Sequence, residues 1–161
     1  MEQFASAVQG FVALLARLAL MTIFIVSTVS NKIPQFSQTV QFMTQEKVPI
    51  PMAALACAIG LLLLGSVSLL LGAWTRIGAF FLLVFLCAAT YYFHDFWTFT
   101  DPLQRQLQTI QFLKNLAIGG GLLSLMAFGA GPWSVDGWIG RKQAEAETDA
   151  PAAKPRVQAK A

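Results

Sequence analysis

Four long apolar runs constrain the fold of this chain more than any other feature of the sequence. They cover about residues 8–29, 51–72, 77–93 and 109–128. A helix needs roughly 20 mostly apolar residues to cross the hydrocarbon core of a bilayer. Only 12% of the residues are charged, about half the share that is usual in soluble domains. The sequence therefore predicts an all-α, polytopic membrane protein built as a four-transmembrane-helix bundle.

The chain divides by composition into residues 1–140, the predicted four-helix transmembrane domain, and residues 141–161, a polar tail. Ala, Lys, Glu and Pro dominate the tail, which contains no aromatic residue. A segment of this kind buries too little apolar area to fold, so we expect it to be disordered. Four spans place both termini on one side of the membrane, and the basic tail residues favour the cytoplasm for that side.

Two segments outside the spans are expected to lie at the membrane surface. Ser37–Glu46 is predicted to form a short helix whose apolar residues Phe36, Val40 and Met43 face the lipid, because they recur at helical spacing. The aromatic cluster from Tyr91 to Phe99 is typical of the headgroup level. A loop over residues 98–108 is then expected to precede the fourth span.

Small residues are expected to bring the helices together, because the hydrophobic effect does not drive association inside lipid. The second span offers Ala54 with Ala58, and Ser68 with Gly72; the fourth offers Gly119–Gly121. We predict that these residues lie in helix contacts and that Gly120→Leu abolishes a stable bundle.

Arg17 lies near the middle of the first apolar run. An arginine at that depth costs at least about 2.5 kcal/mol on insertion scales, so it must face the bundle interior or a wet cavity. The alternative to a ligand-binding role is a structural one, in which Arg17 donates to helix-end carbonyls of a neighbouring helix.

A second polar group lies where the third span ends and the fourth begins, and it consists of His94, Asp95, Lys114 and Asn115. The topology places these residues on one side of the membrane. We expect Lys114 to pair with Asp95, Asn115 to bond across helices, and His94 with Asp95 to relay protons to a quinol-like molecule. The alternatives are an interfacial polar cap and a Lys114 side chain that extends outward to water.

The predicted spans contain no Asp or Glu, so Arg17 and Lys114 lack an intramembrane counter-ion. Three partners remain open: backbone carbonyls, another protein, or an electron-rich ligand such as a quinone carbonyl or a lipid phosphate. The sequence shows no metal-ligand spacing, no nucleotide-binding loop and no nucleic-acid motif. Cys57 and Cys87 lie outside any redox motif and are expected to be small buried side chains.

An ordered set of motifs resembles the DoxX family of bacterial four-helix inner-membrane proteins. The resemblance covers about residues 10–138. It rests on Ala16-Arg17-Leu18, Lys32, Val48-Pro49-Ile50-Pro51, Gly72 with Thr75-Arg76, Phe93-His94-Asp95-Phe96-Trp97, Phe112-Leu113-Lys114-Asn115-Leu116, Gly120-Gly121-Leu122-Leu123, and Gly131 with Ser134-Val135-Asp136.

The resemblance implies a multi-pass protein of the bacterial inner membrane, quinone as the cofactor, and other subunits of a membrane oxidoreductase as partners. The family is named for a subunit of a terminal quinol oxidase. Family members often carry a glutamate in the second span, whereas residues 60–66 here contain no acid. A glycine that is usual before Lys32 is also missing, and Ser30-Asn31 stands there.

Together these observations predict a membrane subunit or accessory of a quinone-linked oxidoreductase, whether or not the chain is itself catalytic. Its ligand cavity is expected to be lined by Arg17, His94, Asp95, Lys114 and Asn115. The main alternative is a non-enzymatic scaffold or assembly factor for a membrane redox complex. A carrier of small solutes or lipids is a third hypothesis, although no pair of broken spans supports it.

Overall fold

The computed structural model describes residues 1–149, and its regular elements there are all helical. Four helices are long and apolar enough to cross a membrane, as predicted. In chain order the elements are α1 (Glu2–Ser27), the π-helical turn η1 (Thr28–Lys32), α2 (Phe36–Gln45), α3 (Pro51–Leu71), α4 (Thr75–Phe93), α5 (Pro102–Phe128) and α6 (Val135–Asp149).

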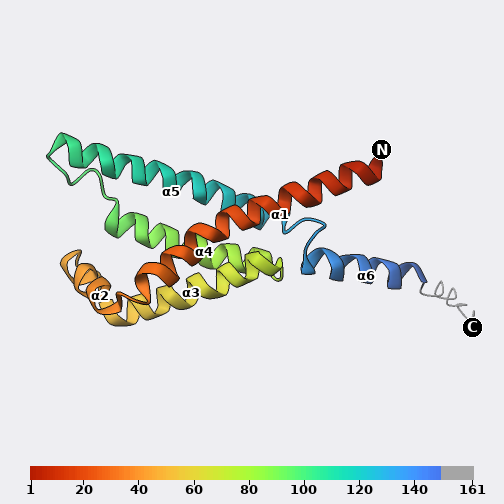
Figure 1. Cartoon of the computed structure of the whole chain (residues 1–161), viewed down its shortest axis with the longest axis horizontal. Helices are drawn as coiled ribbons and strands as arrows, with labels where there is room; N and C mark the ends of the chain where they lie inside the picture. Colours follow the sequence, from red (N-terminus) through yellow and green to blue (C-terminus); the bar gives the residue numbers. More distant parts are fainter. Residues whose placement is uncertain (150–161) are drawn as a thin grey trace, which may run out of the picture.

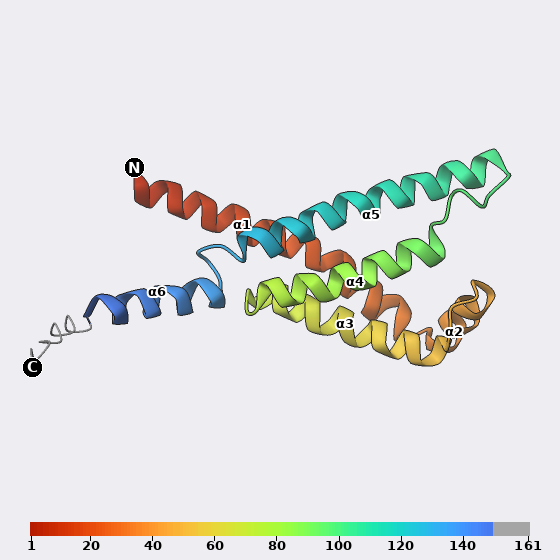
Figure 2. The ribbon, with the colours of Figure 1, turned by 180° about the vertical axis from the view of Figure 1, so that it is seen from behind.

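The molecule has two ends that differ in structure (Figure 1). At the terminal end lie the N-terminus, the turn at residues 72–74 between α3 and α4, and the start of α6. At the α2 end lie η1, α2 and the connection at residues 94–101 between α4 and α5. Seen from behind, α1 and α6 again leave the bundle at the same end, where α3 meets α4 (Figure 2).

Two helix boundaries differ from the predicted ones because of polar residues. The fourth span begins at Pro102, where a loop was expected, since Asp101 accepts a hydrogen bond from the N–H of Gln104 at 2.9 Å and caps the helix. Proline also suits the first turn of a helix. Hydropathy locates only the apolar part of such a helix, so its polar first turns were read as a loop.

The second difference lies in the segment that was expected to be disordered. Residues 141–149 continue α6 as a helix. Their side chains are Arg, Lys, Gln, Ala, Glu and Thr before Asp149, and most of these are good helix formers. The remaining part of the predicted tail, residues 150–161, lies outside the described residues.

Glycine allows α3 and α4 to pack closely as an antiparallel pair. A Cβ atom on Gly65 would lie 2.6 Å from Cγ of Leu82, and one on Gly78 would lie 2.2 Å from Oγ of Ser68. The predicted contact at Gly120 is wrong, because a Cβ there meets nothing within 4 Å. The three consecutive glycines each face a different direction on the helix, and only structure identifies the packed ones.

The main core lies between α1, α3, α4 and α5, and consists of Phe24, Leu62, Leu69, Ala79, Leu82, Leu86, Leu122 and Leu125. The outward faces of these helices carry many exposed apolar side chains, which suit contact with acyl chains. Cys57 and Cys87 lie on this exposed surface rather than in the core, contrary to expectation.

Helix α2 packs against the beginning of α3 instead of presenting its apolar face to lipid. Met43 is 7% exposed and forms a second core with Val48 and Leu55, against which Phe36 and Val40 pack. The predicted lipid-facing orientation is therefore wrong. The periodicity identified the apolar face of α2 correctly. Periodicity does not show whether lipid or a neighbouring helix packs against that face.

Candidate functional site

Arg17 is part of a buried hydrogen-bond network at the terminal end. The side chain is 1% exposed, and its guanidinium donates to the carbonyl of Leu69 at 3.2 Å and to that of Trp133 at 2.5 Å. It lies level with the last turn of α3, at the terminal end of the bundle. Helix α1 begins earlier than predicted and extends past the bundle, which shifts Arg17 toward this end (Figure 1).

Asp136 completes this network from the start of α6. Its carboxylate accepts the N–H of Trp74 at 2.8 Å and that of Thr75 at 3.0 Å, and so caps the N-terminus of α4. Its own N–H donates to the carbonyl of Gly72 at 2.9 Å. Gly72 has a positive φ, and a Cβ there would lie 2.1 Å from Nη1 of Arg17. The terminal end is thus held by contacts within the chain.

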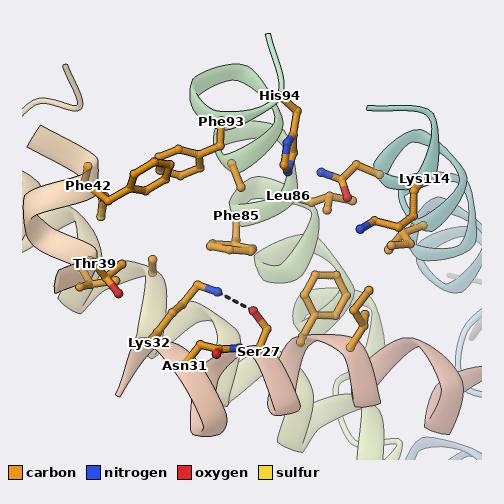
Figure 3. A pocket seen from close by; sticks show the side chains of 18 residues that line it. Ser27, Asn31, Lys32, Thr39, Phe42, Phe85, Leu86, Phe93, His94 and Lys114 are labelled. Carbon is orange, nitrogen blue, oxygen red and sulfur yellow. Dashed lines mark hydrogen bonds between the residues drawn. The ribbon is translucent and has the colours of Figure 1, made fainter. Parts of the chain in front are cut away.

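A cavity of about 410 Å³ lies at the α2 end, where α1, η1, α2, α3, α4 and α5 meet (Figure 3). Its polar side chains are Ser27, Asn31, Lys32, Thr39, His94, Lys114 and Asn115. Its aromatic side chains are Phe24, Phe42, Phe85 and Phe93. We call this space the head cavity. It joins an apolar, aromatic interior to a polar group of side chains at one end of the bundle.

The π-helical turn η1 positions Lys32 in the head cavity. Lys32 Nζ donates to Oγ of Ser27 at 2.6 Å and lies 5.3 Å from the centroid of the Phe85 ring (Figure 3). Thr28, at the start of the turn, is fully buried and donates to the carbonyl of Phe24 at 2.7 Å. Single π turns inside α-helices often mark functional sites.

The sequence prediction did not include Lys32, Ser27 or Asn31 among the cavity residues. Lys32 had been noted only as part of a family motif. A signal was present, because a lysine that ends an apolar run with a serine five positions earlier contains a potential hydrogen-bonded pair. The π turn that brings them together cannot be recognised from hydropathy or helix propensity.

Helices α4 and α5 contribute His94, Lys114 and Asn115. His94 Nδ1 is hydrogen-bonded to the side-chain oxygen of Gln108 at 2.9 Å, and the imidazole points into the cavity (Figure 3). Asn115 donates from Nδ2 to Oγ1 of Thr90 at 2.9 Å, which confirms the expected bond across helices. The structure thus brings three of the five predicted residues together.

The expected ion pair between Lys114 and Asp95 is absent. Lys114 Nζ donates to the side-chain oxygen of Gln111, three residues earlier in α5. Asp95 Oδ2 accepts from Oγ1 of Thr98 at 3.0 Å. In both bonds the partner lies three residues away in the sequence. Such local bonds cost less conformational entropy than an ion pair between α5 and the connection that precedes it.

Arg17 and Asp95 are not among the residues that line the head cavity. Arg17 lies at the opposite end of the bundle, beside the last turn of α3. Asp95 follows His94 immediately, but its carboxylate is held by Thr98. A single cavity containing all five predicted residues is therefore not formed.

The head cavity is positively charged. Lys32 and Lys114 supply two ammonium groups, and the described residues that line it include no carboxylate. Each ammonium carries three donors, and only one acceptor side chain is assigned to each. Over residues 1–149, no group of three His, Cys, Asp or Glu side chains is arranged to hold a metal ion. The lining suits a ligand with electron-rich oxygens on an apolar ring.

Comparison with known proteins gives one family and two similar relatives. The family described as DoxX matches residues 12–95. Inner membrane protein YphA of Escherichia coli (strain K12) is 32% identical over 124 residues, which cover 76% of this chain and 86% of that protein. Inner membrane protein YqjF of the same organism is 32% identical over 129 residues, covering 80% and 92% respectively. No solved structure gives a significant match.

Proposed function

Because the chain belongs to the DoxX family, we propose that it is a bacterial inner-membrane protein whose head cavity binds a quinone. Both relatives are named as inner membrane proteins, which supports this location. In this role the chain is the membrane subunit or an accessory of a quinone-linked oxidoreductase. Reduction of a quinone takes two electrons and two protons, and we assign the electrons to a redox group of a partner subunit.

The observation that carries the proposal is the pairing of two lysines with aromatic rings in one cavity. A quinone has a planar apolar ring with a carbonyl oxygen on opposite sides. Phe85 and Phe93 offer ring faces and edges for packing. Lys32 and Lys114 offer charged donors, whose hydrogen bonds are stronger than those of neutral donors.

His94 is the residue that we assign to proton exchange with the bound quinone. Its Nδ1 is engaged by Gln108 at 2.9 Å, which fixes the orientation of the ring and leaves Nε2 for a ligand. An imidazole nitrogen within hydrogen-bond reach of a ligand oxygen serves as a general acid or base toward it.

Exposed basic residues support an orientation with the terminal end in the cytoplasm. Outside the head cavity, this end carries Arg76, Arg141 and Lys142, whereas the α2 end carries Lys47 and Arg105. Lys32 and Lys114 are not counted among the surface charges, because both line the head cavity. The positive-inside rule then places the head cavity on the periplasmic side. C-terminal fusions should be fluorescent with green fluorescent protein and inactive with alkaline phosphatase; the reverse pattern contradicts this orientation.

Photolabelling of the purified protein with a quinone analogue carrying a photoreactive group tests the function. We expect labelled peptides from η1, α4 and α5, and at least about tenfold weaker binding in the Lys32→Ala, Lys114→Ala double variant, because hydrogen bonds to charged groups contribute about 1.5–3 kcal/mol each. Arg105→Ala removes an exposed cation of the same end outside the cavity and is the matched control.

Labelling that does not respond to the double variant rejects the quinone site. If the chain also copurifies with a redox complex without binding quinone, the scaffold or assembly function replaces the proposed one.

A further inference from the structure

A second, apolar cavity of about 200 Å³ adjoins the head cavity. The two share the side chains of Met43, Ala58, Phe85, Ala89 and Phe93. We call this second space the side cavity. Because the same five side chains line both, the two spaces are adjacent and lie on either side of one shared wall between α2, α3 and α4.

The shared wall contains two small side chains. Ala58 comes from α3 and Ala89 from α4, which are antiparallel neighbours in the bundle. The aromatic rings of Phe85 and Phe93 belong to the same wall, and Phe93 is stacked on Phe42 of α2 with centroids 5.4 Å apart (Figure 3). Because alanine has only a methyl group, the wall is thin at these two positions.

The two cavities differ in charge. The head cavity contains the ammonium groups of Lys32 and Lys114, whereas the described lining of the side cavity contains no charged side chain. Ala88 and Pro49, which border the side cavity, are exposed on the outer surface. The two adjacent cavities are therefore a cationic compartment and an apolar one, and the apolar one lies beside the surface that faces lipid.

We propose that the side cavity holds the beginning of the isoprenoid chain of a prenylated quinone, so that the site selects prenylated quinones over the same head group without a chain. This inference rests on the proposed quinone site and adds the class of ligand. A cavity of about 200 Å³ has room for the beginning of one chain, which favours a singly prenylated ring over a phospholipid with two acyl chains. Burial of the chain's apolar surface adds affinity in proportion to its area.

Binding of two probes tests the proposal: 2,3-dimethoxy-5-methyl-1,4-benzoquinone, and the same ring with a diprenyl chain. The measurement is the dissociation constant for the full chain in lipid nanodiscs. In Ala54→Leu, which changes a residue that lines the side cavity but not the head cavity, we expect affinity for the prenylated probe to fall at least about tenfold, and affinity for the chainless ring to change less than about twofold. Ala56→Leu, two residues away on the exposed face of α3, is the matched control.

A photoreactive group on the first isoprene unit provides a second measurement in the unmodified protein, which does not depend on how the variants fold. We expect it to label residues 88–92 of α4 or the segment at Val48 and Pro49. Labelling spread over the outward faces of all four spans would overturn the proposal.

The outcomes separate this inference from the function on which it rests. Equal effects of Ala54→Leu on both probes would remove the side-cavity proposal while leaving quinone binding intact. Failure of both probes to bind the wild-type protein rejects the quinone site itself. Displacement of the prenylated probe by oleate at similar concentration, with the chainless ring still bound, would assign the side cavity to an acyl chain instead.

Discussion

The two ends of the bundle use cationic side chains in opposite ways. At the terminal end, Arg17 is 1% exposed and donates to two backbone carbonyls from distant parts of the chain. At the α2 end, Lys32 and Lys114 bond to side chains within five residues of themselves and border a cavity of about 410 Å³. Depth of burial alone therefore does not separate a cation that holds the fold from a candidate ligand-binding one, and the two lysines differ from Arg17 in bordering open space.

Arg17→Ala should produce the largest loss of stability. The substitution leaves the carbonyls of Leu69 and Trp133 without their donor and opens a space beside Gly72. We expect the free energy of unfolding to fall by about 2–4 kcal/mol, since each buried unsatisfied group costs about 1–3 kcal/mol. Titration with dodecyl sulfate, followed by circular dichroism, measures it. Wild-type stability combined with lost quinone binding would reverse the assignment of the two ends.

Gly65→Leu should rank next, because it disrupts the packing of α3 on α4 that both ends share. The first added carbon already lies 2.6 Å from Leu82 and 2.9 Å from the carbonyl of Gly78. Overpacking typically costs about 1–3 kcal/mol. Gly120→Leu is the control, because open space surrounds that position, and its thermal midpoint should match the wild type. A larger loss at Gly120 than at Gly65 would contradict the packing described here.

Asp136→Ala should weaken only the terminal end. It removes the acceptor for the N–H groups of Trp74 and Thr75, and loss of a helix cap costs about 0.5–2 kcal/mol. Asp136→Asn retains one acceptor oxygen and should recover part of the stability. Hydrogen exchange at the first turn of α4 reports the change. The α2 end should keep its exchange rates, and equal acceleration there would show that the two ends are coupled.

Lys32→Ala and Lys114→Ala should have the smallest effect on stability. Their bonds to Ser27 and Gln111 are local, and we expect a change within about 0.5 kcal/mol for each, the usual range for substitutions outside the core. The same dodecyl sulfate titration measures it, with Arg17→Ala as the comparison. A loss as large as that of Arg17→Ala would mean that the lysines hold the bundle together.

Much of the fold follows from the sequence because a bilayer restricts the choices. Apolar runs and spacing predicted the four spans and a short helix over residues 37–46, which the structure has at Phe36–Gln45. The bond of Asn115 across helices was predicted from its polar side chain inside a span. Each depends on local periodicity or on the cost of an unsatisfied polar group in lipid. These constraints act on the sequence itself.

The candidate site was harder to predict because it depends on where each side chain lies along the bundle and on which neighbouring group it bonds to. The sequence places Arg17 in the first span but does not show how far α1 extends past its neighbours. It identifies Lys114 and Asp95 on one side, but it does not show that Gln111 and Thr98 bond to them first. The cover of α2 was misassigned for the same reason, since Met43 packs equally well against a helix or a lipid chain.

The widened turn η1 gives the head cavity a tolerance to chain length. A π turn accommodates one residue more than an α turn, so each of its residues rotates the chain by less than the roughly 100° of an α-helix. Five steps of the π turn and four steps of an α turn both amount to slightly more than one full rotation. Removing a single residue between Thr28 and Asn31 would therefore allow α1 to continue as a regular helix with Lys32 on nearly the same face. Chains of this architecture that differ by one residue in this short segment would thus retain both the bundle and its cationic chamber.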